Sequence, residues 1–93
     1  VYDVALEELE ECLWTERDTV ERAVEGNLLG EAISRFLWEQ PPLYRDVFVL
    51  RYYHFSSIQR IAKAYAIGES KTKSILFRTR KKLRVFLESE GLL

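Results

Sequence analysis

Apolar side chains in the last third of the chain recur at helical spacing. Projected at 100° per residue, one set falls within an arc of about 120°: Thr72, Ile75, Leu76, Thr79, Leu83, Phe86 and Leu87. This stripe predicts a helix from Glu69 to about Leu87, with Gly91 near its natural stop.

Two shorter helices are predicted before it. Gln40-Pro41-Pro42 ends one helix and suits the start of the next, which should run to about Tyr53. Ser56 and Gln59 have the spacing of a capping box, which opens a short helix that ends at Ala66-Ile67-Gly68. The expected inward positions of these two helices are Leu43, Val47, Leu50, Ile58, Ile61, Ala62 and Tyr65.

The N-terminal part gives a weaker pattern. Asp18 and Glu21 form a second capping box, so a helix should begin near Asp18 and either break near Gly26 or bury both faces. We expect residues 1–17 to form an acidic arm or short helix, and residues 18–93 to form the main domain. Because no segment alternates with period two, the predicted fold is all-α: a small bundle of four to five helices with a C-terminal helix-turn-helix.

Charge divides the chain into two halves. Residues 1–50 carry 4 basic and 12 acidic side chains, a balance of -8, whereas residues 51–93 carry 10 basic and 3 acidic ones, a balance of +7. Seven of those ten cations lie between Gly68 and Arg84. On the predicted last helix they lie opposite the apolar stripe or along its two flanks, so the exposed face is cationic along its whole length. Such a face is the electrostatic footprint of a protein that binds a polyanion.

The order of a short helix, a tight turn and a long basic helix is typical of a helix-turn-helix, which presents its second helix to the major groove. The ordered motifs resemble the C-terminal promoter-binding region, region 4, of bacterial RNA polymerase sigma factors of the extracytoplasmic-function-like kind. The matching residues are Pro41, Tyr44 to Tyr53, Ser57-Ile58, Ile61-Ala62-Lys63, Lys73-Ser74 and Phe77 to Arg84. Three positions depart from that pattern: Ala66 replaces a usual glycine, Gly68 a capping serine or threonine, and Thr72 a valine or isoleucine.

The resemblance implies sequence-specific binding of double-stranded promoter DNA at the upstream, minus-thirty-five element. The first turns of the last helix would meet base edges, with the candidates Glu69, Ser70, Lys73, Ser74 and Phe77. Phosphate contacts would fix the register, with the candidates Arg51, Lys71, Arg78 and Lys81. The implied protein partners are core RNA polymerase, through the flap of its β subunit, and an anti-sigma factor, with the chain itself a monomer.

Two other functions stay open on the sequence. One is a response-regulator-type activator with a similar helix pair, and the other is a protein-interaction module that binds an anti-sigma regulator. An enzyme is not expected, because no phosphate loop, nucleophile constellation, cofactor motif or metal-ligand set is visible. Neither a membrane span nor a secretory leader is visible, so we expect a cytoplasmic location.

Some residues have a structural interpretation instead. The aromatic residues expected in the core are Trp14, Trp38, Tyr52, Tyr53 and Phe55. The carboxylates Glu7, Glu8, Glu10 and Glu11 form either a solvated face or an arm that docks on the basic helix and masks it.

Overall fold

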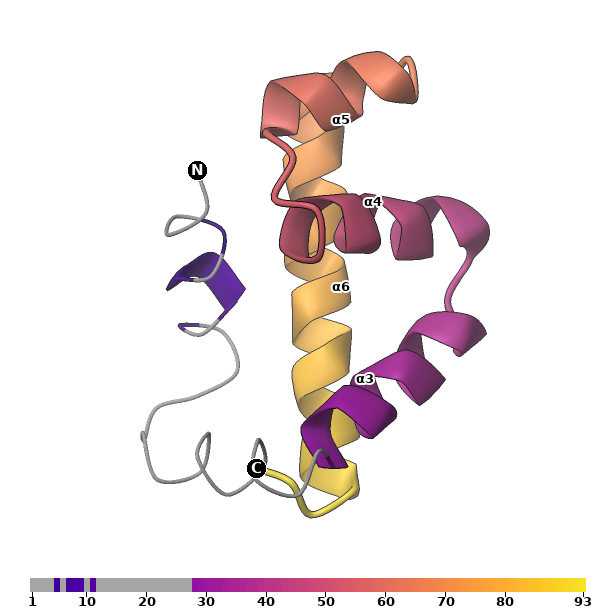
Figure 1. Ribbon diagram of the computed structural model, residues 1–93, viewed down its shortest axis with the longest axis vertical. Coiled ribbons are helices and arrows are strands. Elements are labelled where there is room, and N and C mark those ends of the chain that lie inside the picture. Colours follow the sequence, from indigo (N-terminus) through magenta and orange to yellow (C-terminus); the bar gives the residue numbers. More distant parts are fainter. Residues whose placement is uncertain (1–4, 6, 10, 12–27) are drawn as a thin grey trace.

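The computed structural model describes residues 5, 7–9, 11 and 28–93, and every regular element in these ranges is helical. In the numbering of Figure 1, the helices are α3 (Leu28–Glu39), α4 (Pro42–Tyr52), α5 (Ile58–Ala64) and α6 (Glu69–Ser89). The predicted all-α fold is confirmed. The capping box at Asp18 and the expected start of the preceding helix lie outside the described residues.

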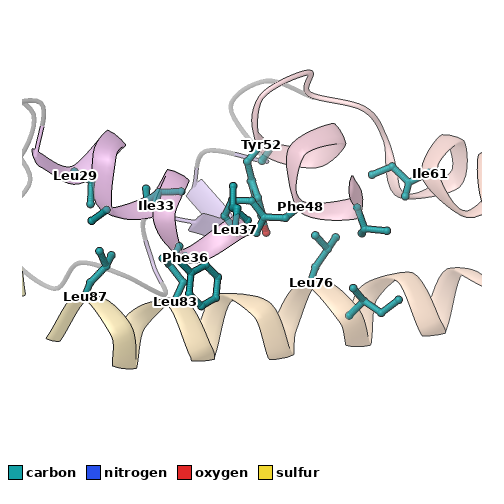
Figure 2. Packing of buried hydrophobic residues seen from close by; sticks show 14 residues of the cluster. Leu29, Ile33, Phe36, Leu37, Phe48, Tyr52, Ile61, Leu76, Leu83 and Leu87 are labelled. Carbon is teal, nitrogen blue, oxygen red and sulfur yellow. The ribbon is translucent and has the colours of Figure 1, made fainter. Parts of the chain in front are cut away.

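Helix α6 is the long helix against which α3, α4 and α5 all pack. Helices α5, α4 and α3 cross it one after another from its N-terminal to its C-terminal end (Figure 1). Figure 2 shows the resulting core, in which Leu76 lies between α4 and α5, while Leu83 and Leu87 lie beneath α3. The predicted stripe is confirmed: all its members are buried except Phe86, which is half-buried with its ring centroid 5.6 Å from that of Phe36.

Two threonines of α6 are buried although they carry hydroxyl groups. The Thr72 hydroxyl donates to the Gly68 carbonyl oxygen at 2.9 Å, and the Thr79 hydroxyl donates to that of Ile75 at 2.7 Å. Because each hydroxyl is satisfied one turn back along its own helix, only the methyl group has to be accommodated by the core.

The start of α5 corrects the expected capping box by one residue. Ser57, not Ser56, is the N-cap, and its hydroxyl oxygen accepts from the Arg60 backbone N–H at 3.1 Å. Ser56 belongs instead to the turn that closes α4, where its N–H donates to the Leu50 carbonyl at 2.9 Å. That turn places Phe55 at φ 55°, which moves the helix start past Ser56.

The tight turn between α5 and α6 is a Schellman motif. The Ile67 N–H donates to the Ala62 carbonyl at 3.0 Å, and the Ala66 N–H donates to that of Lys63 at 3.3 Å. This geometry puts Ala66 in the left-handed region, at φ 53°. Gly68 then begins α6 as its N-cap, without a side-chain hydrogen bond, as expected for glycine in place of serine.

Helix α6 ends in the same motif, but with glycine at the left-handed position. Gly91 has φ 75°, and the Leu92 N–H donates to the Leu87 carbonyl at 2.9 Å. The predicted stop is therefore confirmed, with the helix extending to Ser89.

Candidate nucleic-acid interface

The N-terminal half of α6 presents a polar and cationic face away from the core. All the predicted base-edge residues are exposed on it: Glu69, Ser70, Lys73, Ser74 and Phe77. Three of the predicted phosphate contacts, Lys71, Arg78 and Lys81, are exposed on the same helix. The packing of α5 and the hydrogen-bonded turn at Ala66 hold the start of α6 against the core, and so fix the positions from which these side chains project.

Phe77 is the large apolar side chain in this face. It is 50% exposed, and the Lys81 Nζ lies 4.7 Å from its ring centroid. The Arg80 guanidinium carbon lies 6.0 Å from the same centroid. Cations at these distances interact favourably with the ring, so Phe77 is held at the surface instead of folding into the core.

A cavity of about 300 Å³ opens beside Phe77. Its lining comes from three parts of the chain, namely the N-terminal segment, α5 and α6: Glu8, Ile58, Lys73, Leu76, Phe77 and Arg80. The cavity therefore joins two candidate base contacts to a carboxylate that is distant in sequence.

Arg51, the fourth predicted phosphate contact, lies inside the fold. It is only 5% exposed, and its Nη2 lies 3.0 Å from the Glu8 Oε2. Its Nη1 donates to the Ser56 carbonyl oxygen at 3.0 Å, which ties it to the turn after α4. With both ends of the guanidinium occupied inside the fold, Arg51 is not presented to an external phosphate in this arrangement.

Glu8 is held by two further groups. The Tyr52 hydroxyl donates to its Oε1 at 2.7 Å, and the Arg80 Nη1 lies 3.2 Å from the same oxygen. Arg80 also donates to the Tyr52 hydroxyl at 2.6 Å, which links the three partners into one network. No local pattern in the sequence indicates this pairing, because the partners of Glu8 lie 43 to 72 residues away from it.

The network sets the ionisation of its members. Burial raises the pKa of Glu8, but hydrogen bonds from Arg51 and Tyr52, together with the charges of Arg51 and Arg80, bring the pKa below its ordinary value. Burial and the hydrogen bond to Glu8 raise the pKa of Tyr52. At neutral pH the carboxylate is therefore charged and the phenol is protonated.

The acidic segment was expected to be either a solvated face or a docked arm, and its described carboxylates include both kinds. Glu8 docks beside the basic helix, whereas Glu7 and Glu11 are exposed. Ala5 is fully buried, so this segment also contributes to the core. Glu10 lies outside the described residues.

Two of the expected core aromatic residues are at the surface. Trp38 is 75% exposed, with its ring 5.0 Å from the Arg45 guanidinium carbon, and Tyr53 is 53% exposed. Each directly follows the last inward position of its helix, Leu37 or Tyr52, and therefore points away from the core. Tyr52 is buried and Phe55 half-buried, as predicted, and Trp14 lies outside the described residues.

Within the described ranges, no group of three or more potential metal-ligating side chains comes together. None of the helices described is long and apolar enough to cross a membrane.

Comparison with known proteins adds one match. Residues 41–85 match the family model for sigma-70, region 4, which supports a sigma-70 region 4 domain in this part of the chain. The matched segment contains α4, α5, the Ala66 turn and most of α6. No curated protein and no solved structure gave a match to the chain.

Proposed function

We propose that the chain recognises the minus-thirty-five promoter element as the region 4 module of an extracytoplasmic-function-like sigma factor. The sigma-70 region 4 match supports promoter-DNA binding of the sigma-factor type and binding to core RNA polymerase, in a family that is not catalytic. The observation that carries the finer proposal is the exposed cationic face of α6, directly after the capped α5 and its tight turn.

The base-edge role falls to the first two turns of α6. The exposed side chains there combine donors and acceptors: Glu69 can accept from cytosine, Lys73 can donate to guanine, and serines serve either. Phe77, exposed beside Lys81, would contact a thymine methyl group.

The sequence-independent contacts come from Lys71, Arg78 and Lys81, whose exposed charges flank that surface. With one phosphate contacted by each of these three residues, log K should fall with log salt with a slope of roughly -3. Residues 18–93 would form the monomeric DNA-binding unit, with residues 1–17 as an arm upon it, and the buried Ala5 supports such packing.

Protein partners would use another surface. The exposed Trp38 and the half-buried Arg45 form a cation–π pair at the junction of α3 and α4. We assign this junction to protein contact with the β-subunit flap or an anti-sigma factor, because it lies on different helices from the DNA-facing residues.

A pair of matched alanine variants tests the DNA assignments. Lys73→Ala should relax preference at one base pair, at a cost of about 1–3 kcal/mol on the preferred duplex and little on a random one. Lys81→Ala should weaken binding to every duplex about equally and reduce the salt slope by about 0.9. Both are read by fluorescence anisotropy on promoter and random duplexes over a series of salt concentrations. Equal loss on both duplexes for Lys73→Ala would refute its base-reading role.

A further inference from the structure

Arg51, Tyr52 and Arg80 form a site for one anion, here called the anion site. Two guanidinium groups and one phenol converge on the single carboxylate of Glu8, with contacts of 3.0, 2.7 and 3.2 Å. Among the described residues, no second carboxylate is within ion-pair distance of either arginine. The anion site therefore keeps a positive charge even when Glu8 fills it.

The anion site is built into the fold. The Arg51 side chain is only 6% exposed, and its contact with the Ser56 carbonyl aims it at Glu8. Tyr52 is a core residue of α4, with its ring centroid 4.7 Å from that of Phe48. These two groups would keep their positions if the carboxylate left, because the core and the turn after α4 hold them independently of Glu8.

The anion site also opens toward the candidate DNA surface. The Glu8 side chain is 28% exposed and lines the same cavity as Lys73 and Phe77. Arg80 lies on α6 three residues after Phe77 and reaches both the cavity and the carboxylate. An anion that arrives along the exposed face of α6 would therefore meet Arg80 first.

A phosphodiester group matches what this site already binds. It has the same single negative charge as a carboxylate and two oxygens that can accept from paired N–H donors, the arrangement that arginine recognises best. Glu8 is 43 residues from Arg51 in sequence, so it behaves as an intramolecular ligand that another anion can replace.

We propose that the anion site of Arg51, Tyr52 and Arg80 binds a DNA phosphate, and that the Glu8 carboxylate competes with DNA for it. This inference rests on the proposed DNA binding. Docking of the acidic segment then lowers affinity for DNA of every sequence, because a phosphate contact does not read bases. Arg51, which is buried here, becomes a phosphate ligand only after Glu8 leaves.

The test compares two single-charge variants of the full chain. Glu8→Gln removes the competing charge with little change in shape, and Glu7→Gln removes the same charge from an exposed position in the same segment. Glu8→Gln should bind both promoter and random duplexes at least about fivefold more tightly than the wild type, the lower end of ordinary coupling between two ligands. Glu7→Gln should change either affinity less than twofold.

The double variant Glu8→Gln/Arg80→Gln tests whether the anion site causes the gain in DNA affinity. It should remove the gain and reduce the magnitude of the salt slope by about 0.9, the value for one phosphate contact. Unchanged DNA affinity in Glu8→Gln, or an equal gain in Glu7→Gln, would overturn the proposal.

Two NMR measurements test the anion site directly, independently of promoter recognition and of how the variant folds. Inorganic phosphate should shift the side-chain Nε–H resonances of Arg51 and Arg80 in Glu8→Gln but not in the wild type. In the wild-type chain, saturation with random duplex should move the Glu8 carboxyl carbon resonance to its solvent-exposed position. Absence of either shift refutes the anion site, whereas a lack of promoter preference alone refutes the proposed function and leaves the anion site standing.

Discussion

Ala66 occupies a backbone conformation that favours glycine, and replacing it should stabilise the chain. Its φ of 53° lies in the left-handed region, where the β-carbon of an L residue approaches the following carbonyl oxygen. The Schellman hydrogen bonds of Ala62 and Lys63 hold it there, and the family that the sequence resembles usually has glycine at this place. Ala66 is exposed, so Ala66→Gly removes no buried contact.

The expected gain is the difference between two effects. Relief of the left-handed strain is worth about 1–2 kcal/mol. The greater freedom of glycine in the unfolded chain costs roughly 0.4–1 kcal/mol. Ala66→Gly should therefore raise the free energy of unfolding by about 0.5–1 kcal/mol, which corresponds to roughly 2–8 °C in Tm for a domain of this size.

Urea unfolding followed by circular dichroism measures this change, and Ala64→Gly is the matched control. Ala64 is also exposed and lies two residues earlier, but it belongs to α5. Glycine there should lower the free energy of unfolding by about 0.5–1 kcal/mol. If Ala66→Gly destabilises the chain as Ala64→Gly does, Ala66 is not in the left-handed conformation and the reasoning fails.

Two further predictions concern the core and the anion site. Leu83→Ala removes a side chain that is fully buried beneath α3 and should cost about 2–5 kcal/mol, measured by urea unfolding; a loss below 1 kcal/mol would contradict its place in the core. Because the pKa of Glu8 is lowered by folding, its stabilisation is fully present above the ordinary value of 4.5 and is lost as pH falls through the folded value. The stability gap between the wild type and Glu8→Gln should therefore be present at pH 7 and close in strongly acidic solution; a gap that persists there would refute the assignment.

Local pattern was enough to predict the helices of the C-terminal part of the chain. The stripe from Thr72 to Leu87 and the Pro41-Pro42 signal depend on residues a few positions apart, and the structure confirms both. The capping error of one residue at Ser56 arose because the backbone of the preceding turn, with Phe55 at φ 55°, cannot be read from residue types.

The contacts around Glu8 could not be predicted from local sequence patterns. Arg51 is a candidate phosphate contact because the resemblance implies that role, and nothing in the local sequence indicates that it pairs with Glu8. Its partner lies 43 residues away, and only the folded chain brings the two together. The prediction that Trp38 lies in the core is wrong, because the side chain is 75% exposed and contacts a cation, Arg45, at the surface.

Because α6 is one uninterrupted helix, a small change in its tilt at one end displaces its other end. Its 21 residues span about 31 Å at 1.5 Å per residue, with α5 at one end and α3 at the other. A tilt of about 5° at the α3 end would move the opposite end by ~3 Å, the length of a hydrogen bond. The packing of α3 against α6 therefore affects the position of side chains at the N-terminal end of α6. A substitution in the core beneath α3 can thus weaken DNA recognition although it lies far from the DNA-facing surface.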